Sequence, residues 1–159
     1  VFRHALDPIF GGRVAFVDDY DLHVAHLLVQ GCDVWLNNPR KPLEASGTSG
    51  MKAALNGVPH LSVGDGWWAE GYTGDNGWLI DGGADANQHE AADLADADAL
   101  YTLLENDVVP AFYERDAAGI PPAWMRVVRE AIRTNLPRFS TARMLKDYVR
   151  RLYAPAAAR

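Results

Sequence analysis

The residues best suited to chemistry lie in one stretch, from Glu44 to Gly57, which reads Glu-Ala-Ser-Gly-Thr-Ser-Gly-Met-Lys-Ala-Ala-Leu-Asn-Gly. Gly47 and Gly50 let the backbone turn tightly and approach a ligand without a Cβ atom in the way. The hydroxyl residues around them are common helix N-caps, so a helix is expected to start here. Unpaired N–H groups at a helix start form a ready site for an anion.

Lys52 falls in about the first turn of this expected helix, and Glu44 stands just ahead of the helix. A cation in the first turn faces the positive end of the helix dipole, which gives a solvated lysine no advantage. The position of Lys52 therefore indicates an anionic or covalent partner. Gly57 stands where a left-handed C-cap would end the helix.

Other familiar site patterns do not fit the sequence. The five histidines are scattered, and the pair His23 and His26 has no arranged ligand partners, so no zinc site is expected. A Gly-x-Ser-x-Gly nucleophile elbow, a P-loop and a Gly-x-Gly-x-x-Gly dinucleotide fingerprint are all missing.

Composition narrows the class of protein further. A chain of 159 residues with 48% hydrophobic content is the size of one domain with a real core. The net charge of −6 argues against nucleic-acid or acidic-membrane partners. A lone cysteine, Cys32, fits a reducing compartment, and no apolar run of membrane-spanning length is present, so we expect a cytoplasmic protein. The first residue, Val1, leads almost at once into a strand-like run, which suggests part of a longer chain.

Strand and helix patterns alternate in the first half of the chain. Short apolar runs predict strands and helical spacing predicts helices, in the order strand 14–17, helix 21–30, strand 32–36, helix 48–56, strand 58–63 and strand 78–80. This alternation predicts an α/β fold: a three-layer, Rossmann-like parallel sheet with helices on both faces. Ligands bind such sheets beyond the carboxyl ends of the strands, where the loop 37–47 and residues 18–20 would lie.

The remaining segments are expected to be a long loop and a helical tail. The loop 64–78 holds five glycines and several aromatic residues, which suits either sugar stacking or packing over a strand end. Residues 81–95 are expected to form a surface loop. Helices are expected at 96–106, capped by Asp96 or Asp98 and continuing to about 113, at 123–134 and at 140–153. The domain prediction is a single unit over 1–159, with a β/α sheet region to about 80 and C-terminal helices from about 96 to 159.

The segment from Glu44 to Lys52 closely resembles the pyridoxal-phosphate site of the α-glucan (glycogen, starch, maltodextrin) phosphorylases. The resemblance extends to Val14–Tyr20, Asn37–Pro39, Asp65–Trp68 and Phe139–Arg143 with Tyr148, the middle two matching the shorter bacterial and archaeal branch. It implies the C-terminal part of the C-terminal domain of a glycosyltransferase fold of the B type (GT-B). The N-terminal domain and the first half of the C-terminal domain would then lie outside this chain.

The resemblance also implies a role for each matching residue. Lys52 would hold pyridoxal 5′-phosphate as a Schiff base, and Tyr20 would line the cofactor pocket. The backbone at Gly47 and Thr48 would bind the cofactor phosphate and the substrate phosphate beside it. The glucosyl unit would be bound by the carboxylate of Glu44 and by the backbone at Ala45, Ser46 and Gly47.

The implied reaction is the phosphorolysis of an α-1,4-glucan. The cofactor phosphate would exchange a proton with inorganic phosphate, which attacks the terminal glucose and gives α-glucose 1-phosphate with retention. Asp21 stands where longer members of the family carry an arginine, so that contact is not expected here. The family's substrate-phosphate lysine and arginine would precede Val1, and we therefore expect the chain alone to be inactive. A partial sheet with an open edge also favours self-association into homo-oligomers.

Two other interpretations stay open. A nucleotide-sugar glycosyltransferase of the same fold, similar to glycogen synthase, would not need Lys52 and would place two glutamates eight residues apart. Leu36 stands eight residues before Glu44, which weakens that interpretation. The chain is alternatively a non-catalytic module that keeps the motif.

Overall fold

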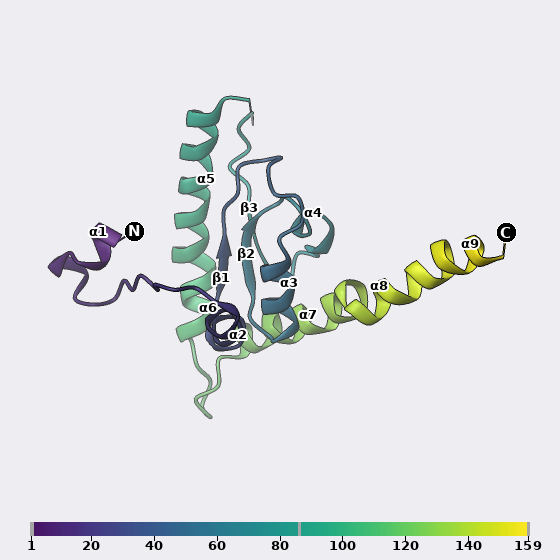
Figure 1. The fold of residues 1–159 in the computed structure, drawn as a ribbon. Coiled ribbons are helices and arrows are strands. Elements are labelled where there is room, and N and C mark those ends of the chain that lie inside the picture. Colours follow the sequence, from purple (N-terminus) through teal and green to yellow (C-terminus); the bar gives the residue numbers. More distant parts are fainter. Residues whose placement is uncertain (1, 86, 159) are drawn as a thin grey trace.

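The computed structural model describes residues 2–85 and 87–158, and its centre is a parallel sheet (Figure 1). Strands β1 (Trp35–Asn37), β2 (His60–Val63) and β3 (Gly77–Ile80) lie in the order β1-β2-β3. Trp35 is opposite His60, and His60 is opposite Gly77. Helix α3 (Thr48–Leu55) connects β1 to β2, and helix α4 (Trp68–Gly71) connects β2 to β3. The predicted α/β fold with a parallel sheet is confirmed.

Helices cover both faces of the sheet. Successive side chains of a strand point to opposite faces, so each strand contributes side chains to the packing on both. On one face, a cluster of buried side chains joins β2 and β3 to the helices of the C-terminal half; it consists of Leu61, Val63, Trp78, Ile80, Val108 and Trp124. On the other face, Ala54 of α3 packs with Trp67 and Trp68, and Leu79 of β3 lies against them. The sheet is therefore the middle of three layers.

The strand predicted at 14–17 does not form. After helix α1 (Phe2–Ala5) and a 3-10 turn (Pro8–Phe10), residues 13–17 have no regular secondary structure. Phe16 and Val17 are 49% and 47% exposed, and the segment runs away from the sheet (Figure 1). A strand is stabilised by the ladder of a neighbouring strand, and this segment has none among the described residues. The prediction was wrong, and the described sheet has three strands rather than four.

Helix α2 (Leu22–Gly31) forms as predicted, and its N-cap explains the role of Asp21. The Asp21 carboxylate accepts a hydrogen bond from the N–H of Val24 at 2.8 Å. Helix α3 also ends as predicted, with Gly57 in the left-handed region at φ +81°.

The second half of the chain contains more helix than expected. Helix α5 (His89–Leu103) begins well before Asp96, so the loop predicted over 81–95 is wrong from His89 onward. The first turns of α5 are largely exposed and alanine-rich, so they lack the apolar stripe on which the prediction depended. Asp96 caps no helix; its carboxylate accepts the N–H of Gly82 at 2.9 Å.

Beyond α5 the described chain is mostly helical, apart from a loop at 114–121. A π-helical turn (Leu104–Val108) leads into α6 (Val109–Tyr113), which continues past Pro110 as predicted. The remaining elements are α7 (Pro122–Phe139), α8 (Thr141–Tyr148), a π-helical turn (Val149–Tyr153) and α9 (Ala154–Ala157). Helix α7 runs past the predicted end near Thr134, and Ser140 caps α8 as predicted.

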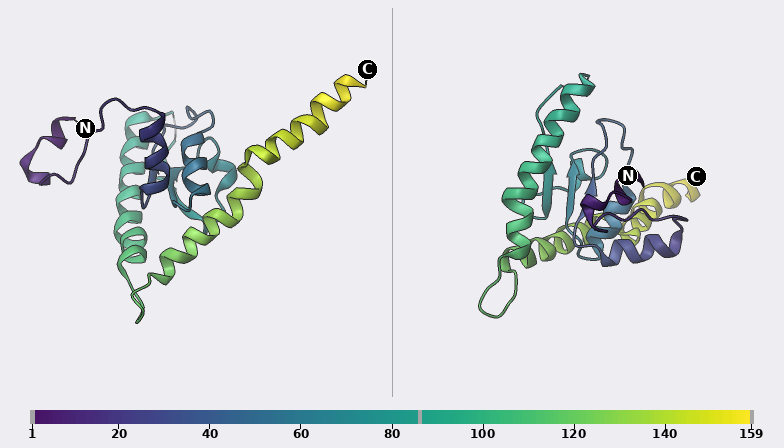
Figure 2. Two further views of the ribbon diagram at one scale, coloured as in Figure 1. Left: turned by 60° about the horizontal axis from the view of Figure 1, so that its bottom comes forward. Right: turned by 90° about the vertical axis from the view of Figure 1, so that its left-hand side faces the viewer.

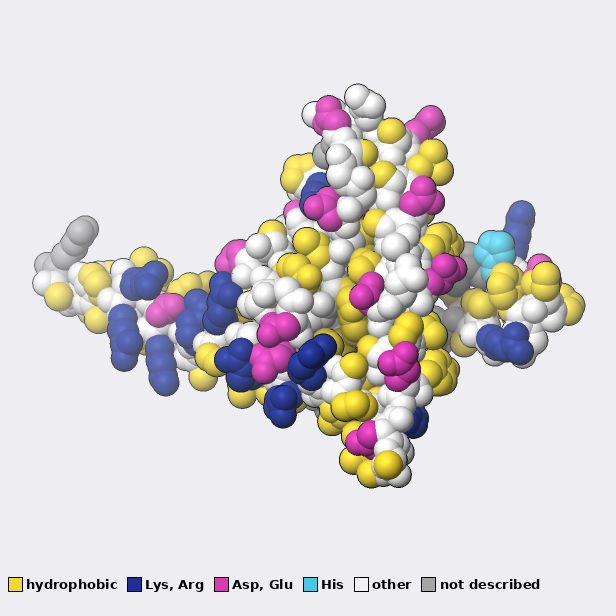
Figure 3. Space-filling view, turned by 180° about the vertical axis from the view of Figure 1, so that it is seen from behind, with side chains coloured by type: hydrophobic (Ala, Val, Ile, Leu, Met, Phe, Trp, Pro, Cys, Tyr) yellow, Lys and Arg dark blue, Asp and Glu magenta, His cyan; other side chains and the backbone are white. Residues whose placement is uncertain are grey.

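The C-terminal helices project from the body of the molecule as a rod, which the views in Figure 2 show from two further sides. Lysine and arginine side chains gather along this rod, whereas acidic side chains gather on and around α5 (Figure 3). No helix in the described part of the chain is long and apolar enough to cross a bilayer.

Candidate functional site

The start of helix α3 is open, but its cap differs from the sequence prediction. The N-cap is Gly47, in the left-handed conformation at φ +82°, and no side chain caps the helix. The hydroxyl residues expected as caps, Ser46, Thr48 and Ser49, therefore do not fill this role. A helix start without a side-chain cap keeps its N–H dipoles for water or a ligand.

Glu44 lies beside this helix start. A Cβ atom added at Gly47 would lie 3.1 Å from Cδ1 of Trp67 and 3.4 Å from Oε1 of Glu44. The structure therefore brings the carboxylate of Glu44 close to the backbone of Gly47. Glycine is required here by both its φ angle and its close neighbours.

Lys52 lies in a hollow between α2 and α3. Ser49, Lys52 and Asn56, which share one face of α3, line it together with Tyr20 and residues of α2 that include Val29. Lys52 and Tyr20 therefore line the same hollow, and Tyr20 is 60% exposed. Glu44, Ala45 and Ser46 do not line this hollow; they lie ahead of the helix start.

A buried aromatic cluster packs against the first turn of α3. The imidazole of His60 is 1% exposed, and its ring centroid lies 5.1 Å from that of Trp67 and 4.8 Å from that of Trp68. Burial lowers the pKa of His60 to about 4, so the ring is neutral at neutral pH. A Cβ atom at Gly50 would lie 2.5 Å from Cε1 of His60, so the helix rests directly on this ring.

Trp67 and Trp68 of the loop 64–78 are part of this packing. Trp67 and Trp68 are both buried, and the Nε1–H of Trp68 donates to the carbonyl oxygen of Trp78 at 3.2 Å. For these residues the packing interpretation is confirmed over sugar stacking.

Sequence reasoning missed the residue that fixes the loop ahead of α3. Asp65, two residues after the end of β2, accepts the main-chain N–H of Glu44 at 2.9 Å. The N–H of Trp67 donates to the carbonyl oxygen of Ser46 at 2.8 Å. In the sequence, Asp65–Trp68 stands out only because it resembles the phosphorylases, and that resemblance does not predict these contacts.

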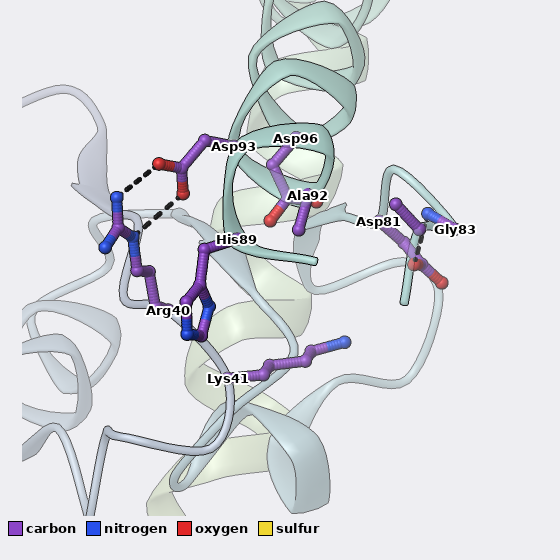
Figure 4. A pocket seen from close by; sticks show the side chains of 9 residues that line it. Arg40, Lys41, Asp81, Gly83, His89, Ala92, Asp93 and Asp96 are labelled. Atoms are coloured by element: carbon purple, nitrogen blue, oxygen red, sulfur yellow. Dashed lines mark hydrogen bonds and ion pairs between the residues drawn. The ribbon is translucent and has the colours of Figure 1, made fainter. Parts of the chain in front are cut away.

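A second polar hollow lies beside the same loop (Figure 4). It is lined by side chains from the loop after β1, the loop after β3 and the first turns of α5, namely Arg40, Lys41, Asp81, His89, Asp93 and Asp96. The Nε–H of Arg40 donates to Oδ1 of Asp93 at 2.9 Å, and a second Arg40 N–H bonds to Oδ2. The hydrogen bonds from Arg40 lower the pKa of Asp93. The pair fastens the segment that leads into Glu44 to α5, a contact that sequence reasoning did not predict.

The fold and these contacts define a parallel α/β protein whose polar groups gather around the loop and helix start that follow β1. Over 154 residues, 97% of this chain, it is 54% identical to a glycogen phosphorylase of Aquifex aeolicus, of which it covers 22%. It is 54% identical over 160 residues to a glycogen phosphorylase of Mycobacterium bovis, and 50% identical over 158 residues to a maltodextrin phosphorylase of Thermococcus litoralis. In both cases the match covers 99% of this chain and 18% of the relative.

The chain therefore resembles the C-terminal part of glycogen and maltodextrin phosphorylases over nearly its whole length, which confirms the resemblance found in the sequence. It spans about a fifth of the length of these relatives. No protein-family model and no solved structure matches the chain.

Proposed function

We propose that this chain is the cofactor-binding part of an α-1,4-glucan phosphorylase. The complete enzyme transfers terminal glucosyl units to inorganic phosphate and releases α-glucose 1-phosphate. The observation that carries the proposal is the identity of 50–54% to glycogen and maltodextrin phosphorylases over nearly the whole chain. These relatives do not support the nucleotide-sugar glycosyltransferase interpretation better than the phosphorylase interpretation.

The proposal includes the domain context. Residues 1–159 form part of a single C-terminal domain of the GT-B type, and the rest of the enzyme supplies the other walls of the site. Among the described residues β1 has a neighbouring strand on one side only, and such an edge favours pairing with another strand, in the rest of the enzyme or in a second copy. The single cysteine, Cys32, fits a cytoplasmic enzyme.

The residues present fit pyridoxal 5′-phosphate. The cofactor needs an amine to hold its aldehyde and a donor-rich cradle for its phosphate. Lys52 supplies an exposed amine in the hollow that Tyr20 also lines. The helix start at Gly47, which has no side-chain cap, supplies the cradle, and a Cβ atom there would crowd Trp67 and Glu44.

In this proposal each group of the chain has one task. When bound, the cofactor supplies a phosphate group that exchanges a proton with inorganic phosphate. Lys52 holds the cofactor, Tyr20 closes one side of its pocket, and the backbone N–H groups at Gly47 and Thr48 orient the phosphates. The substrate's glucosyl hydroxyls donate to the carboxylate of Glu44, and the backbone at Ala45, Ser46 and Gly47 completes that contact. Asp21, an acidic residue that caps α2, would supply no positive charge to a bound phosphate.

The test is phosphate-dependent release of glucose 1-phosphate from maltodextrin by the full-length protein. We expect release only when phosphate is present, and we expect Lys52→Ala to abolish it. Lys146→Ala on α8 is the matched control, since it removes an exposed lysine far from the site in sequence, and it should retain activity. Glucosyl transfer from a nucleotide sugar without phosphate dependence would refute the proposal. The isolated chain should release no glucose 1-phosphate, because part of the site lies outside it.

A further inference from the structure

The carboxylate of Asp65 holds the loop ahead of α3 through its main chain. Oδ2 accepts the N–H of Glu44 at 2.9 Å, and Oδ1 accepts the N–H of Gly66 at 2.9 Å. The N–H of Asp65 in turn donates to the carbonyl oxygen of Val63 at 2.8 Å, which ties this residue to the end of β2. A charged acceptor makes such bonds about twice as strong as neutral ones.

A second contact fixes the same loop two residues further on. The N–H of Trp67 donates to the carbonyl oxygen of Ser46 at 2.8 Å, and the Trp67 side chain is only 3% exposed. The two main chains approach so closely that a Cβ atom at Gly66 would lie 2.7 Å from the Ser46 oxygen and 2.9 Å from Cγ of Glu44. Gly66 also has a φ of +52°. The loop after β2 therefore forms a clamp on Glu44 and Ser46.

We propose that Asp65 is a positioning residue that holds Glu44 in the orientation that binds the glucosyl unit. This inference rests on the proposed function, in which Glu44 contacts the substrate. Glu44 supplies one of the two main-chain N–H groups that the Asp65 carboxylate accepts, so the structure gives Asp65 a path to the substrate through Glu44. Lys52 and Tyr20 lie in a hollow that Glu44 and Ser46 do not line, so the amine that would hold the cofactor lies apart from this clamp.

The test is Asp65→Asn in the full-length protein. An amide offers one oxygen and turns its NH2 group toward the second main-chain N–H, so the bond to Glu44 is either lost or loses the charge that strengthened it. We expect the KM for glucose 1-phosphate to rise about tenfold or more, as the loss of one charge-assisted hydrogen bond implies. The kcat, the cofactor content and the cofactor absorbance should stay close to those of the parent.

Asp116→Asn is the matched control. Asp116 also accepts main-chain N–H groups, from Ala118 and Ile120, but both bonds go to the same oxygen, Oδ1. The amide oxygen of asparagine can keep both bonds, and the loop lies in another part of the chain. We expect the KM for glucose 1-phosphate to be unchanged in this variant.

A double-mutant cycle with Glu44→Gln tests whether Asp65 acts through Glu44. We expect the double variant to bind glucose 1-phosphate about as weakly as the weaker single variant, because both changes remove the same interaction. Additive losses, an unchanged KM in Asp65→Asn, or a parallel loss of cofactor would each overturn the inference alone. Absence of phosphorolysis in the unsubstituted protein would overturn the proposed function as well.

Discussion

Gly50 in the first turn of α3 has no space for a side chain, and Gly50→Ala tests this packing. A Cβ atom there would lie 2.5 Å from Cε1 and 3.0 Å from Nδ1 of His60, and 2.9 Å from Nε1 of Trp67. His60 has little room to move because it is buried against both Trp67 and Trp68. Overpacking of this kind costs about 1–3 kcal/mol, whereas alanine gains up to about 1 kcal/mol in a helix. We therefore expect a net loss of about 1–2 kcal/mol in the free energy of unfolding.

Urea unfolding followed by tryptophan fluorescence measures this loss, since the cluster itself contains tryptophans. Gly31→Ala is the matched control: Gly31 ends α2, and a Cβ atom there meets nothing within 4 Å. That variant should be as stable as the parent or slightly more so. If Gly50→Ala is equally stable, the close contact between α3 and His60 is refuted.

Two further predictions concern His60 and Asp21. Burial lowers the pKa of His60 to about 4, so between about pH 6.5 and 4 the unfolded chain binds a proton that the folded chain does not. The stability contributed by neutral His60 is present above about pH 6.5 and is lost as the pH falls, by about 3 kcal/mol at most. Denaturant unfolding at several pH values should show a shallower dependence for His60→Gln, and identical slopes would contradict the prediction. Asp21→Ala removes the bond to the Val24 N–H and should lower the free energy of unfolding by about 1 kcal/mol, whereas Asp21→Asn should cost much less; equal losses in the two variants would refute the capping role.

The fold could be predicted where a segment's own residues favour a strand or helix and where each strand has a neighbouring strand in this chain to pair with. The strands β2 and β3 and the helix α3 carry clear apolar runs and helix formers, so their order and type follow from the sequence. Residues 14–17 carry an equally clear apolar run, yet a strand depends on a neighbour that a local pattern does not supply. The start of α5 was missed for the opposite reason: it is helical without an apolar stripe, because its alanines favour a helix by themselves.

The candidate site was predictable where it is contiguous. Residues from Glu44 to Lys52 lie within one turn-and-helix unit, so their types and spacing could be interpreted directly. The contacts that fix this unit join residues far apart in the chain, 21 positions for Asp65 with Glu44 and 53 for Arg40 with Asp93. Such pairs become visible only when the strands bring their carboxyl ends to one edge of the sheet.

The central claim is that Lys52 holds pyridoxal phosphate, and one labelling experiment tests it most directly. The full-length protein is incubated with pyridoxal phosphate, reduced with borohydride and digested, and the labelled peptide is identified by mass. This chain contains three lysines, Lys41, Lys52 and Lys146, which give internal controls. We predict a stoichiometric label on Lys52 within this chain and its loss in Lys52→Arg. A protein without label on Lys52, or with equal label on all three lysines, would contradict the claim.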